Sequence, residues 1–423
     1  MEALRWAEGP RWYRPDYRRC LTGVFPTVFS LLGRPVEDRP GLTEFLPARS
    51  PQKARRVLLM CLDALGFKEL ALSSRLKELY PQYGTWITSV FPSITSCALT
   101  SMYQALPPAL HGNLGHIIYK DIPGAVMDLL KGRVMGASAS LKEAGLDTNL
   151  LKSAQGILDT HGHVLPGFQV MDHLIVNSGL SEIIYGDVPR VGFVDPLEGV
   201  SKVSAMLSDM EQGWISMYLA RVDTLSHVIT GGIPQMGVLL RHLEDMLGWL
   251  AGSLDRKVLD ETVLMVAADH GQNNIVQRLP LHGDDAAWLE AHTRGLGHSG
   301  RVLHVYLDPG REQTVYDWLT GFIGKAGRVF RFDEIRGLTG PEELFAPDGG
   351  GNGPRPDLGA VRRSLGDLVV VLNEGWNWDR TGTVPAAGSY ESRLLSQHGA
   401  LTWDEVFIPF IVAPLSSLLP DAG

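Results

Sequence analysis

Apolar runs of strand length alternate with segments of helical periodicity along most of this chain of 423 residues. Such runs, each followed by polar turn residues or by helix-period sequence, are typical of buried parallel strands joined by crossover helices. The clearest runs are 57–62, 214–222, 262–268, 302–307, 367–372 and 406–413, and the clearest helical segments are 68–79, 237–254 and 312–323. The pattern predicts an α/β fold with a central, mostly parallel sheet and helices on both faces.

Composition divides the chain into three parts. Residues 1–50 are expected to form an arm packed on the core, and a nucleic-acid arm is the alternative, because Arg5, Arg11, Arg14, Arg18 and Arg19 are interleaved there with Trp and Tyr. Residues 51–271 and 396–423 form the α/β core. Residues 272–395 are richer in Gly and Pro and are expected to continue the core with an inserted cap or loop region near the active site. Within them, prolines interrupt 347–359, which is therefore a surface loop rather than a phosphate-binding loop.

Charge and cysteine content exclude several classes of protein. The chain has 47 acidic and 38 basic residues, a net charge of −9, which argues against a nucleic-acid coat protein or a binder of anionic membranes. Three cysteines, Cys20, Cys61 and Cys97, are too few for a disulfide framework. No apolar stretch reaches the roughly 18 residues of a membrane helix. We expect a cytoplasmic protein with no membrane partner and no specific nucleic-acid binding; nothing in the chain indicates its oligomeric state.

Three of the expected strands end in an aspartate: Asp63, Asp223 and Asp269. A single such aspartate is more often a turn former or a helix N-cap. In an open parallel sheet, however, the carboxyl ends of the strands line the ligand crevice, so all three carboxylates would meet there. His227 follows Asp223 by four residues, which places both on one face of a helical turn, and His270 follows Asp269 directly. A third histidine, His398, precedes the last strand.

Mixed imidazole and carboxylate ligands favour zinc or manganese over calcium or a thiolate-bound metal. Six such side chains are too many for one tetrahedral ion, so the set predicts two divalent metal ions, most simply Zn²⁺, with Mn²⁺ as the alternative. Two such ions carry four positive charges against three aspartates. The resulting local field would attract a phosphate despite the negative charge of the whole chain.

Residues 89–112 contain a Ser/Thr cluster between Pro92 and a helix-compatible stretch, so a hydroxyl here would lie at a helix N-terminus. That end of a helix offers unpaired N–H groups and a favourable dipole to a phosphate. Adjacent divalent ions would lower the pKa of the hydroxyl and make it a nucleophile. Simple N-capping by Ser93, Thr95 or Ser96 is the alternative from this segment alone.

Five separated motifs, taken together and in this order, resemble the type I phosphodiesterase/nucleotide pyrophosphatase branch of the alkaline phosphatase superfamily. The resemblance covers roughly residues 55–415. The motifs are LDALGF, FPSITSCALTS with LPPALHG, YLARVDTLSH, ADHGQ, and QHGALTWDEVFIPFIV. The resemblance implies an alkaline-phosphatase-like fold and two groups of metal ligands. These groups are Asp63, Asp269 and His270 with the nucleophile for one ion, and Asp223, His227 and His398 for the other.

The resemblance also assigns the nucleophile to Thr95, with Ser96 as the reserve candidate. The family has an Asn three positions after its nucleophile, where it helps to hold a phosphate oxygen, but this chain has Ala98 there. Another donor would then replace it, for example Asn113 or a backbone N–H. Asn113 and His116 are the candidate substrate-binding residues.

The function implied is hydrolysis of phosphodiester or nucleotide pyrophosphate bonds in a small-molecule phosphate ester or nucleotide, through a covalent phospho-threonine intermediate. A phosphomonoesterase of the same superfamily is one alternative, and a non-catalytic metal-binding protein that retains the fold is another. A sulfatase is disfavoured because Cys97 lacks the C/S-x-P-x-R context that the modified sulfatase residue needs.

Overall fold

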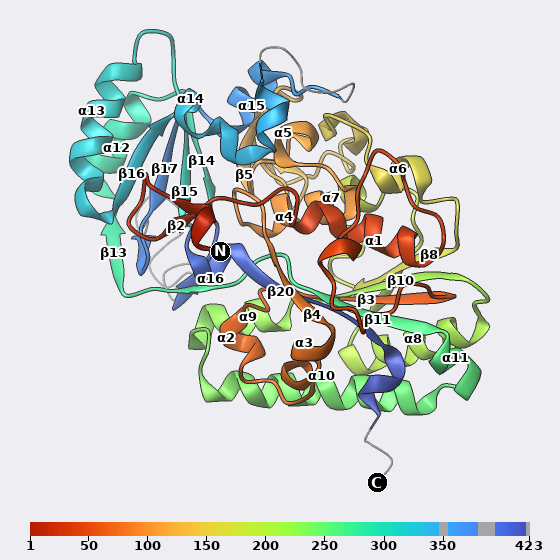
Figure 1. The fold of residues 1–423 in the computed structure, drawn as a ribbon. Coiled ribbons are helices and arrows are strands. Elements are labelled where there is room, and N and C mark those ends of the chain that lie inside the picture. Colours follow the sequence, from red (N-terminus) through yellow and green to blue (C-terminus); the bar gives the residue numbers. More distant parts are fainter. Residues whose placement is uncertain (347–353, 380–393, 420–423) are drawn as a thin grey trace.

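The computed structural model describes residues 1–346, 354–379 and 394–419 and contains two seven-stranded sheets (Figure 1). Three two-stranded ladders accompany them: β1 (Arg5–Trp6) with β2 (Trp12–Tyr13), β12 (Asn273–Asn274) with β19 (Ser396–Gln397), and β13 (Gln277–Pro280) with β18 (Trp376–Asp379). Part of the expected surface loop 347–359 lies outside the described residues.

The central sheet has the strand order β4-β20-β11-β3-β10-β8-β9. Its strands from β11 to β9 are parallel, whereas β20 runs antiparallel to both of its neighbours. The strands are β4 (Gly84–Thr88), β20 (Phe407–Pro414), β11 (Thr262–Ala267), β3 (Arg56–Leu62), β10 (Gly213–Leu219), β8 (Gly167–Asp172) and β9 (Arg190–Phe193). The prediction of an α/β fold with a mostly parallel central sheet is confirmed.

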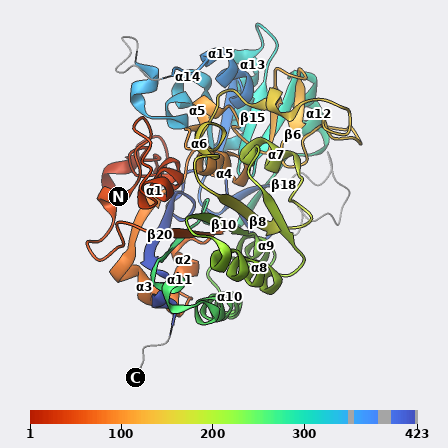
Figure 2. The same cartoon turned by 90° about the vertical axis from the view of Figure 1, so that its right-hand side faces the viewer.

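Helices cover both faces of the central sheet, which explains why β3, β10 and β11 are buried along their whole length. In Figures 1 and 2, one group of helices lies above the sheet and another below it. The upper group is α1 (Val24–Leu31), α4 (Thr95–Gln104), α6 (Ile157–His161) and α7 (Gly179–Tyr185). The lower group is α2 (Phe67–Leu70), α3 (Arg75–Tyr83), α8 (Pro196–Asp209), α9 (Arg221–Ile229), α10 (Pro234–Ser253) and α11 (Arg256–Asp260).

The second sheet is antiparallel and has the order β16-β17-β15-β14-β5-β6-β7. Its strands are β16 (Gly327–Arg331), β17 (Leu368–Leu372), β15 (Val302–Tyr306), β14 (Gly295–Ser299), β5 (Ile117–Lys120), β6 (Ala125–Asp128) and β7 (Arg133–Val134). The apolar runs 302–307, 367–372 and 406–413 were expected as parallel strands but form β15 and β17 of this antiparallel sheet and the antiparallel strand β20 of the central sheet. That expectation is wrong because a strand buried on both faces has the same apolar composition in either orientation.

Helices pack on both faces of the second sheet as well. Alternate residues of its strands enter two separate apolar clusters, so Val329 and Phe330 of β16 face opposite sides. The covering helices are α12 (Gly283–Ala291), α13 (Glu312–Ile323), α14 (Phe332–Ile335) and α15 (Leu358–Leu365). The short helices α5 (Pro108–His111) and α16 (Trp403–Val406) complete the set in the described ranges.

Two segments far apart in the sequence build the second sheet. Strands β5, β6 and β7 come from residues 117–134, which the sequence places in the 51–271 core, and the others come from 295–372. These early strands have only two to four residues each and are half-buried, so they lack the long apolar run that marks a core strand.

The N-terminal arm packs on the folded protein through its aromatic residues. Trp6 and Trp12 are buried and lie 5.1 and 5.8 Å from the ring of Phe330 in the second sheet. Tyr13 packs edge-on against Phe407 of the central sheet, and Arg19 lies 3.8 Å from the Trp86 ring. The arm therefore contacts both sheets.

The helices match the periodic segments with one exception. Segment 312–323 is α13 with the expected bounds, and 237–254 lies almost entirely within α10, but 68–79 is divided between α2 and α3. Among the helices of the described ranges, none combines the length and the apolarity that crossing a membrane requires. All three cysteines are buried and form no disulfide.

Candidate active site

The three candidate aspartates lie at the carboxyl ends of three adjacent strands of the central sheet. Asp63 follows β3 directly, Asp269 follows β11, and Asp223 lies in the first turn of α9, which begins just after β10. These strands are neighbours in the order β11-β3-β10. The expected convergence of the three aspartates at one edge of the sheet therefore follows from the strand order.

Asp63, Asp269 and His270 form the first cluster, in which one ligand atom from each residue lies within 4.8 Å of the others. The Nε2 atom of His270 is 3.5 Å from Asp63 Oδ1 and 3.3 Å from Asp269 Oδ2. Both of these oxygens are buried and accept no hydrogen bond, although the other oxygen of each carboxylate does. A buried carboxylate oxygen without a donor is suited to a cation.

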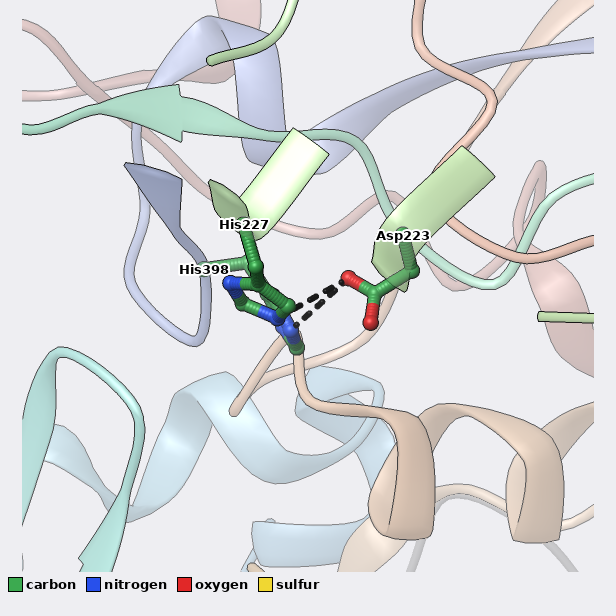
Figure 3. Close-up of side chains that lie close together, drawn as sticks. All are labelled: Asp223, His227 and His398. Carbon is green, nitrogen blue, oxygen red and sulfur yellow. Dashed lines mark ion pairs between the residues drawn. The ribbon is translucent and has the colours of Figure 1, made fainter. Parts of the chain in front are cut away.

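Asp223, His227 and His398 form the second cluster (Figure 3), with ligand atoms again within 4.8 Å of one another. Asp223 Oδ1 lies 3.2 Å from His227 Nε2 and 3.5 Å from His398 Nε2. His227 and Asp223 share one face of α9, whereas His398 comes from the loop after β19. The rings of His398 and His270 stack at 3.6 Å, which places the two clusters side by side.

All three imidazoles are oriented by a backbone carbonyl. The Nδ1 atoms of His227, His270 and His398 lie 2.8, 3.1 and 3.0 Å from the carbonyl oxygens of Ser396, Gly271 and Ser93. A hydrogen bond at Nδ1 fixes the tautomer and directs Nε2 toward the carboxylates, as is usual for metal-bound histidines. The residues present therefore fit two divalent ions with mixed imidazole and carboxylate ligands.

The electrostatics of the clusters also favour bound cations. Burial raises the pKa of Asp63 well above its usual range, and the nearby charges of Asp269 and Asp223 raise it further. Burial lowers the pKa of His398, as does His270, so that its ring is neutral and able to act as a ligand. Burial acts to raise the pKa of Asp223, but the imidazoles of His227 and His398 outweigh it and hold the value below the usual range.

Thr95 is the first residue of α4, and its Oγ1 atom lies 3.1 Å from His270 Nε2, next to the first cluster. Ser96 is fully buried and its Oγ lies 2.8 Å from His116 Nδ1, while Ser93 donates to the carbonyl of Ala400. No side-chain hydroxyl caps α4. The Thr95 hydroxyl therefore lies beside the first cluster, whereas the hydroxyls of Ser96 and Ser93 are engaged with His116 and with the Ala400 carbonyl.

A cavity of about 470 Å³ opens on both clusters and on Thr95. Residues of the 272–395 region contribute to its lining, among them Arg278 of β13, His298 of β14 and Trp378 of β18. The volume lies in the range of small-molecule sites. A hydroxyl at a helix N-terminus, two candidate metal clusters and a small-molecule cavity thus form one continuous site.

The family model for type I phosphodiesterase/nucleotide pyrophosphatase matches residues 57–400, which is most of the chain. The protein belongs to this family. The resemblance expected from the five sequence motifs is therefore confirmed. Membership of this family supports a phosphoric ester hydrolase of the alkaline phosphatase superfamily. No curated protein sequence matches the chain significantly.

Solved structures support the same fold. Murine ectonucleotide pyrophosphatase/phosphodiesterase 5 superposes with a TM-score of 0.61 at 17% identity, covering 84% of this chain and 87% of that one. An inactive variant of the murine enzyme, in complex with AMP, gives 0.60 at 17% identity over 85% and 88%. Phosphonoacetate hydrolase from Sinorhizobium meliloti 1021, in complex with phosphonoformate, gives 0.58 at 17% identity over 87% and 95%.

The two residues expected to bind substrate have different positions in this family member. His116 lines the cavity, and burial together with His270 lowers its pKa to about 3, so its ring is neutral. Asn113 is fully buried outside the lining of the cavity, and its amide donates to Thr100 Oγ1 at 3.3 Å. It is therefore not placed to replace the family Asn whose position is Ala98.

Two residues near the clusters were not singled out by the sequence. Tyr218 of β10 donates a short hydrogen bond to Asp63 Oδ2, and Gln272 donates to Asp223 Oδ1. A tyrosine near the end of a fully buried strand was the available signal, because a buried hydroxyl needs a partner. Gln272 lies within the ADHGQ motif but has no distinguishing feature there.

Proposed function

We propose that this protein is a two-metal phosphohydrolase that cleaves phosphodiester or nucleotide pyrophosphate bonds through a covalent intermediate on Thr95. The single observation that carries the proposal is the position of the Thr95 hydroxyl, at the first residue of α4, facing the cavity and 3.1 Å from His270 of the first cluster. The family assignment supports the same class of reaction.

In the proposed reaction Thr95 Oγ1 loses its proton to solvent and attacks phosphorus. A new P–O bond forms, and the leaving oxygen departs with its electron pair and takes up a proton. Water then attacks the phospho-threonine, and the Thr95 hydroxyl is restored as the phosphate product leaves. The N-terminal end of α4 favours the negative charge of the phosphoryl group in both steps.

Asp63, Asp269 and His270 with Thr95 would hold one ion, and Asp223, His227 and His398 the other. Two divalent ions in these positions would lower the pKa of the attacking hydroxyl. They would also neutralise the negative charge that develops on the leaving oxygen. Zn²⁺ is the proposed metal because imidazole and carboxylate ligands suit it, with Mn²⁺ as the alternative.

The experiment compares Thr95→Ala with Ser96→Ala, which removes the adjacent hydroxyl. Metal-stripped protein is reloaded with Zn²⁺ or Mn²⁺ and assayed with a nucleoside nitrophenyl phosphate and with nitrophenyl phosphate. We expect Thr95→Ala to lower turnover at least about a thousandfold, while metal content stays at two ions per chain. Ser96→Ala should retain at least about a tenth of the activity. Wild-type activity in Thr95→Ala would exclude this nucleophile.

The same assay separates the alternatives. Preference for the diester supports a phosphodiesterase, whereas preference for nitrophenyl phosphate would indicate a phosphomonoesterase of the superfamily. Two bound ions with no turnover of either ester would favour a non-catalytic metal-binding protein. Cytoplasmic localisation is part of the proposal, and fractionation of cells that express the tagged protein tests it.

A further inference from the structure

The cavity has one wall of marked apolarity. It is formed by side chains of α4, α7 and the segment from β8 to α7, which we call the apolar wall. Its members are Leu99, Met171, Ile175, Leu180, Ile184 and Tyr185. All except Ile175 are buried, at 6% exposure or less, although they line the cavity. The cavity thus extends from the metal clusters into the apolar core between α4 and α7.

The polar side chains beside this wall are already engaged within the protein. Ser178 and Ser181 also line the cavity, but Ser178 caps α7 and donates to Ser181 Oγ at 3.1 Å. Ser181 Oγ in turn donates to the carbonyl of Ile175 at 2.7 Å. The hydroxyls of Ser178 and Ser181 form hydrogen bonds at the start of α7. A ligand group placed against the apolar wall therefore makes mainly apolar contacts.

The part of the lining that comes from the 272–395 region is mixed, because Trp378 stands among polar and charged side chains. Arg278, His298, Asn377 and Asp379 come from the 272–395 region and are polar or charged. A substrate in this cavity would thus have its phosphate at the clusters, polar groups beside the 272–395 residues and an apolar group against the wall. A nucleobase placed against the apolar wall would leave its own hydrogen-bonding groups buried without partners, which is costly.

We propose that the apolar wall binds a hydrocarbon group of the substrate, so that the preferred substrates are phosphodiesters with one aliphatic or aryl ester group in place of a nucleoside. This inference rests on the proposed phosphohydrolase function, whose substrate class it narrows. The volume of about 470 Å³ must also hold the phosphate, which limits the hydrocarbon group to moderate size.

The test uses a series of nitrophenyl phosphodiesters that share the leaving group and differ in the retained ester group. Methyl, butyl and hexyl nitrophenyl phosphates are compared with thymidine 5′-nitrophenyl phosphate on the metal-loaded protein. We expect kcat/KM to rise about threefold per added CH₂ from methyl to hexyl. The hexyl ester should also exceed the thymidine ester. Equal kcat/KM along the alkyl series, or preference for the thymidine ester, would overturn the inference.

A matched pair of variants locates the effect. Ile175 is half-buried and lines the cavity, whereas its neighbour Leu174 is 77% exposed and does not. We expect Ile175→Asn to lower the ratio of hexyl to methyl kcat/KM at least about fivefold and Leu174→Asn to leave that ratio unchanged. An unchanged ratio in Ile175→Asn would contradict the assignment of the wall.

Binding measured without turnover separates this inference from the proposed function. Calorimetry of hexylphosphonate and methylphosphonate binding is expected to show tighter binding of the hexyl compound. Failure to hydrolyse any ester would refute the proposed function while this difference still supports the wall. Equal binding of the two phosphonates, with intact hydrolysis, would refute only the hydrocarbon preference.

Discussion

At the scale of single residues, the candidate site is built from side chains whose second polar atom is already bonded. Each histidine bonds a carbonyl through Nδ1, and Asp63 accepts from Tyr218 through Oδ2 while its Oδ1 atom has no donor. Such outer contacts fix the direction of a ligand atom before a metal arrives. Their removal should weaken metal binding without removing any ligand.

Tyr218→Phe tests this at Asp63. Loss of the hydroxyl frees the carboxylate to rotate, and we expect metal affinity to fall about tenfold or more. The metal affinity is measured by titrating the metal-stripped protein with the metal ion in a calorimeter. Tyr103→Phe is the matched control, because the Tyr103 hydroxyl is equally buried but bonds Ser216 at 2.8 Å instead of a candidate ligand. Equal affinity in Tyr218→Phe and wild type would rule out the positioning role.

Glu69 is a buried carboxyl with a consequence for the pH dependence of stability. Burial raises its pKa to about 7, against the lowering effect of Lys68, and Asp404 also contributes to the rise. The folded protein therefore binds this proton more tightly than the unfolded chain does. The contribution of Glu69 is then favourable at low pH and is lost as the pH rises through about 7.

Glu69→Gln should abolish this dependence because the amide does not ionise. We expect the variant to exceed wild type in free energy of unfolding by on the order of 1–3 kcal/mol at pH 8, with the difference shrinking toward pH 5. Urea unfolding at the two pH values checks it, with the exposed Glu78→Gln as control. A difference that is the same at both pH values would show that Glu69 does not titrate in this range.

At the scale of elements, the segment that carries His398 is held between the two sheets. Gly399 has a φ of +115°, and a Cβ atom there would lie 2.1 Å from the carbonyl oxygen of Ser299. Arg301 and Glu405 are both fully buried and form an ion pair at 2.5 Å. Glu405 also accepts from the backbone of Ala400 and Thr402. The ion pair thus ties the hairpin of β14 and β15 to the segment after His398.

Arg301→Met should leave the Glu405 charge buried and unpaired. We expect the free energy of unfolding to fall by about 3–5 kcal/mol, and the double variant with Glu405→Gln to recover part of the loss. Chemical denaturation of the four proteins of the cycle gives the coupling. Additive losses in the double variant would mean that the two side chains do not depend on each other.

Some of the strands could be predicted from sequence patterns, and others could not. The runs that became β3, β10 and β11 were predicted because long buried strands leave an uninterrupted apolar signal, and the aspartates at their ends then located the clusters. The antiparallel direction of β15, β17 and β20 was not predictable, since burial on both faces produces the same residues in either direction. Tyr218 and the apolar wall required tertiary structure, because their neighbours come from distant parts of the chain.

At the scale of the whole molecule, the N-terminal arm joins the two sheets. The sequence predicted that the Arg and aromatic residues of this arm pack against the protein. The rings of Trp6 and Trp12 contact Phe330 of the second sheet, and Tyr13 contacts Phe407 of the central sheet. Trp6 and Trp12 are buried, so their rings are not exposed for stacking on nucleic-acid bases. The arm is expected to stabilise the arrangement of the sheets around the cavity.

Trp12→Ala measures that contribution. Removal of a fully buried indole should lower the free energy of unfolding by about 3–5 kcal/mol. Trp249→Ala is the control, because Trp249 is 49% exposed on α10 and should cost far less. Thermal unfolding of both variants is the measurement. Equal losses of unfolding free energy in Trp12→Ala and Trp249→Ala would contradict a special role for the arm.

The position of β20 has a consequence for the order in which the molecule can form. This strand, residues 407–414, lies between β4 and β11, and the segment just before it supplies His398. During synthesis the earlier strands emerge with a gap in their sheet, and one of the six candidate ligands is still missing. The chain can therefore complete neither its central sheet nor the candidate site until residue 414 has been synthesised, so shorter products of synthesis are expected to lack activity.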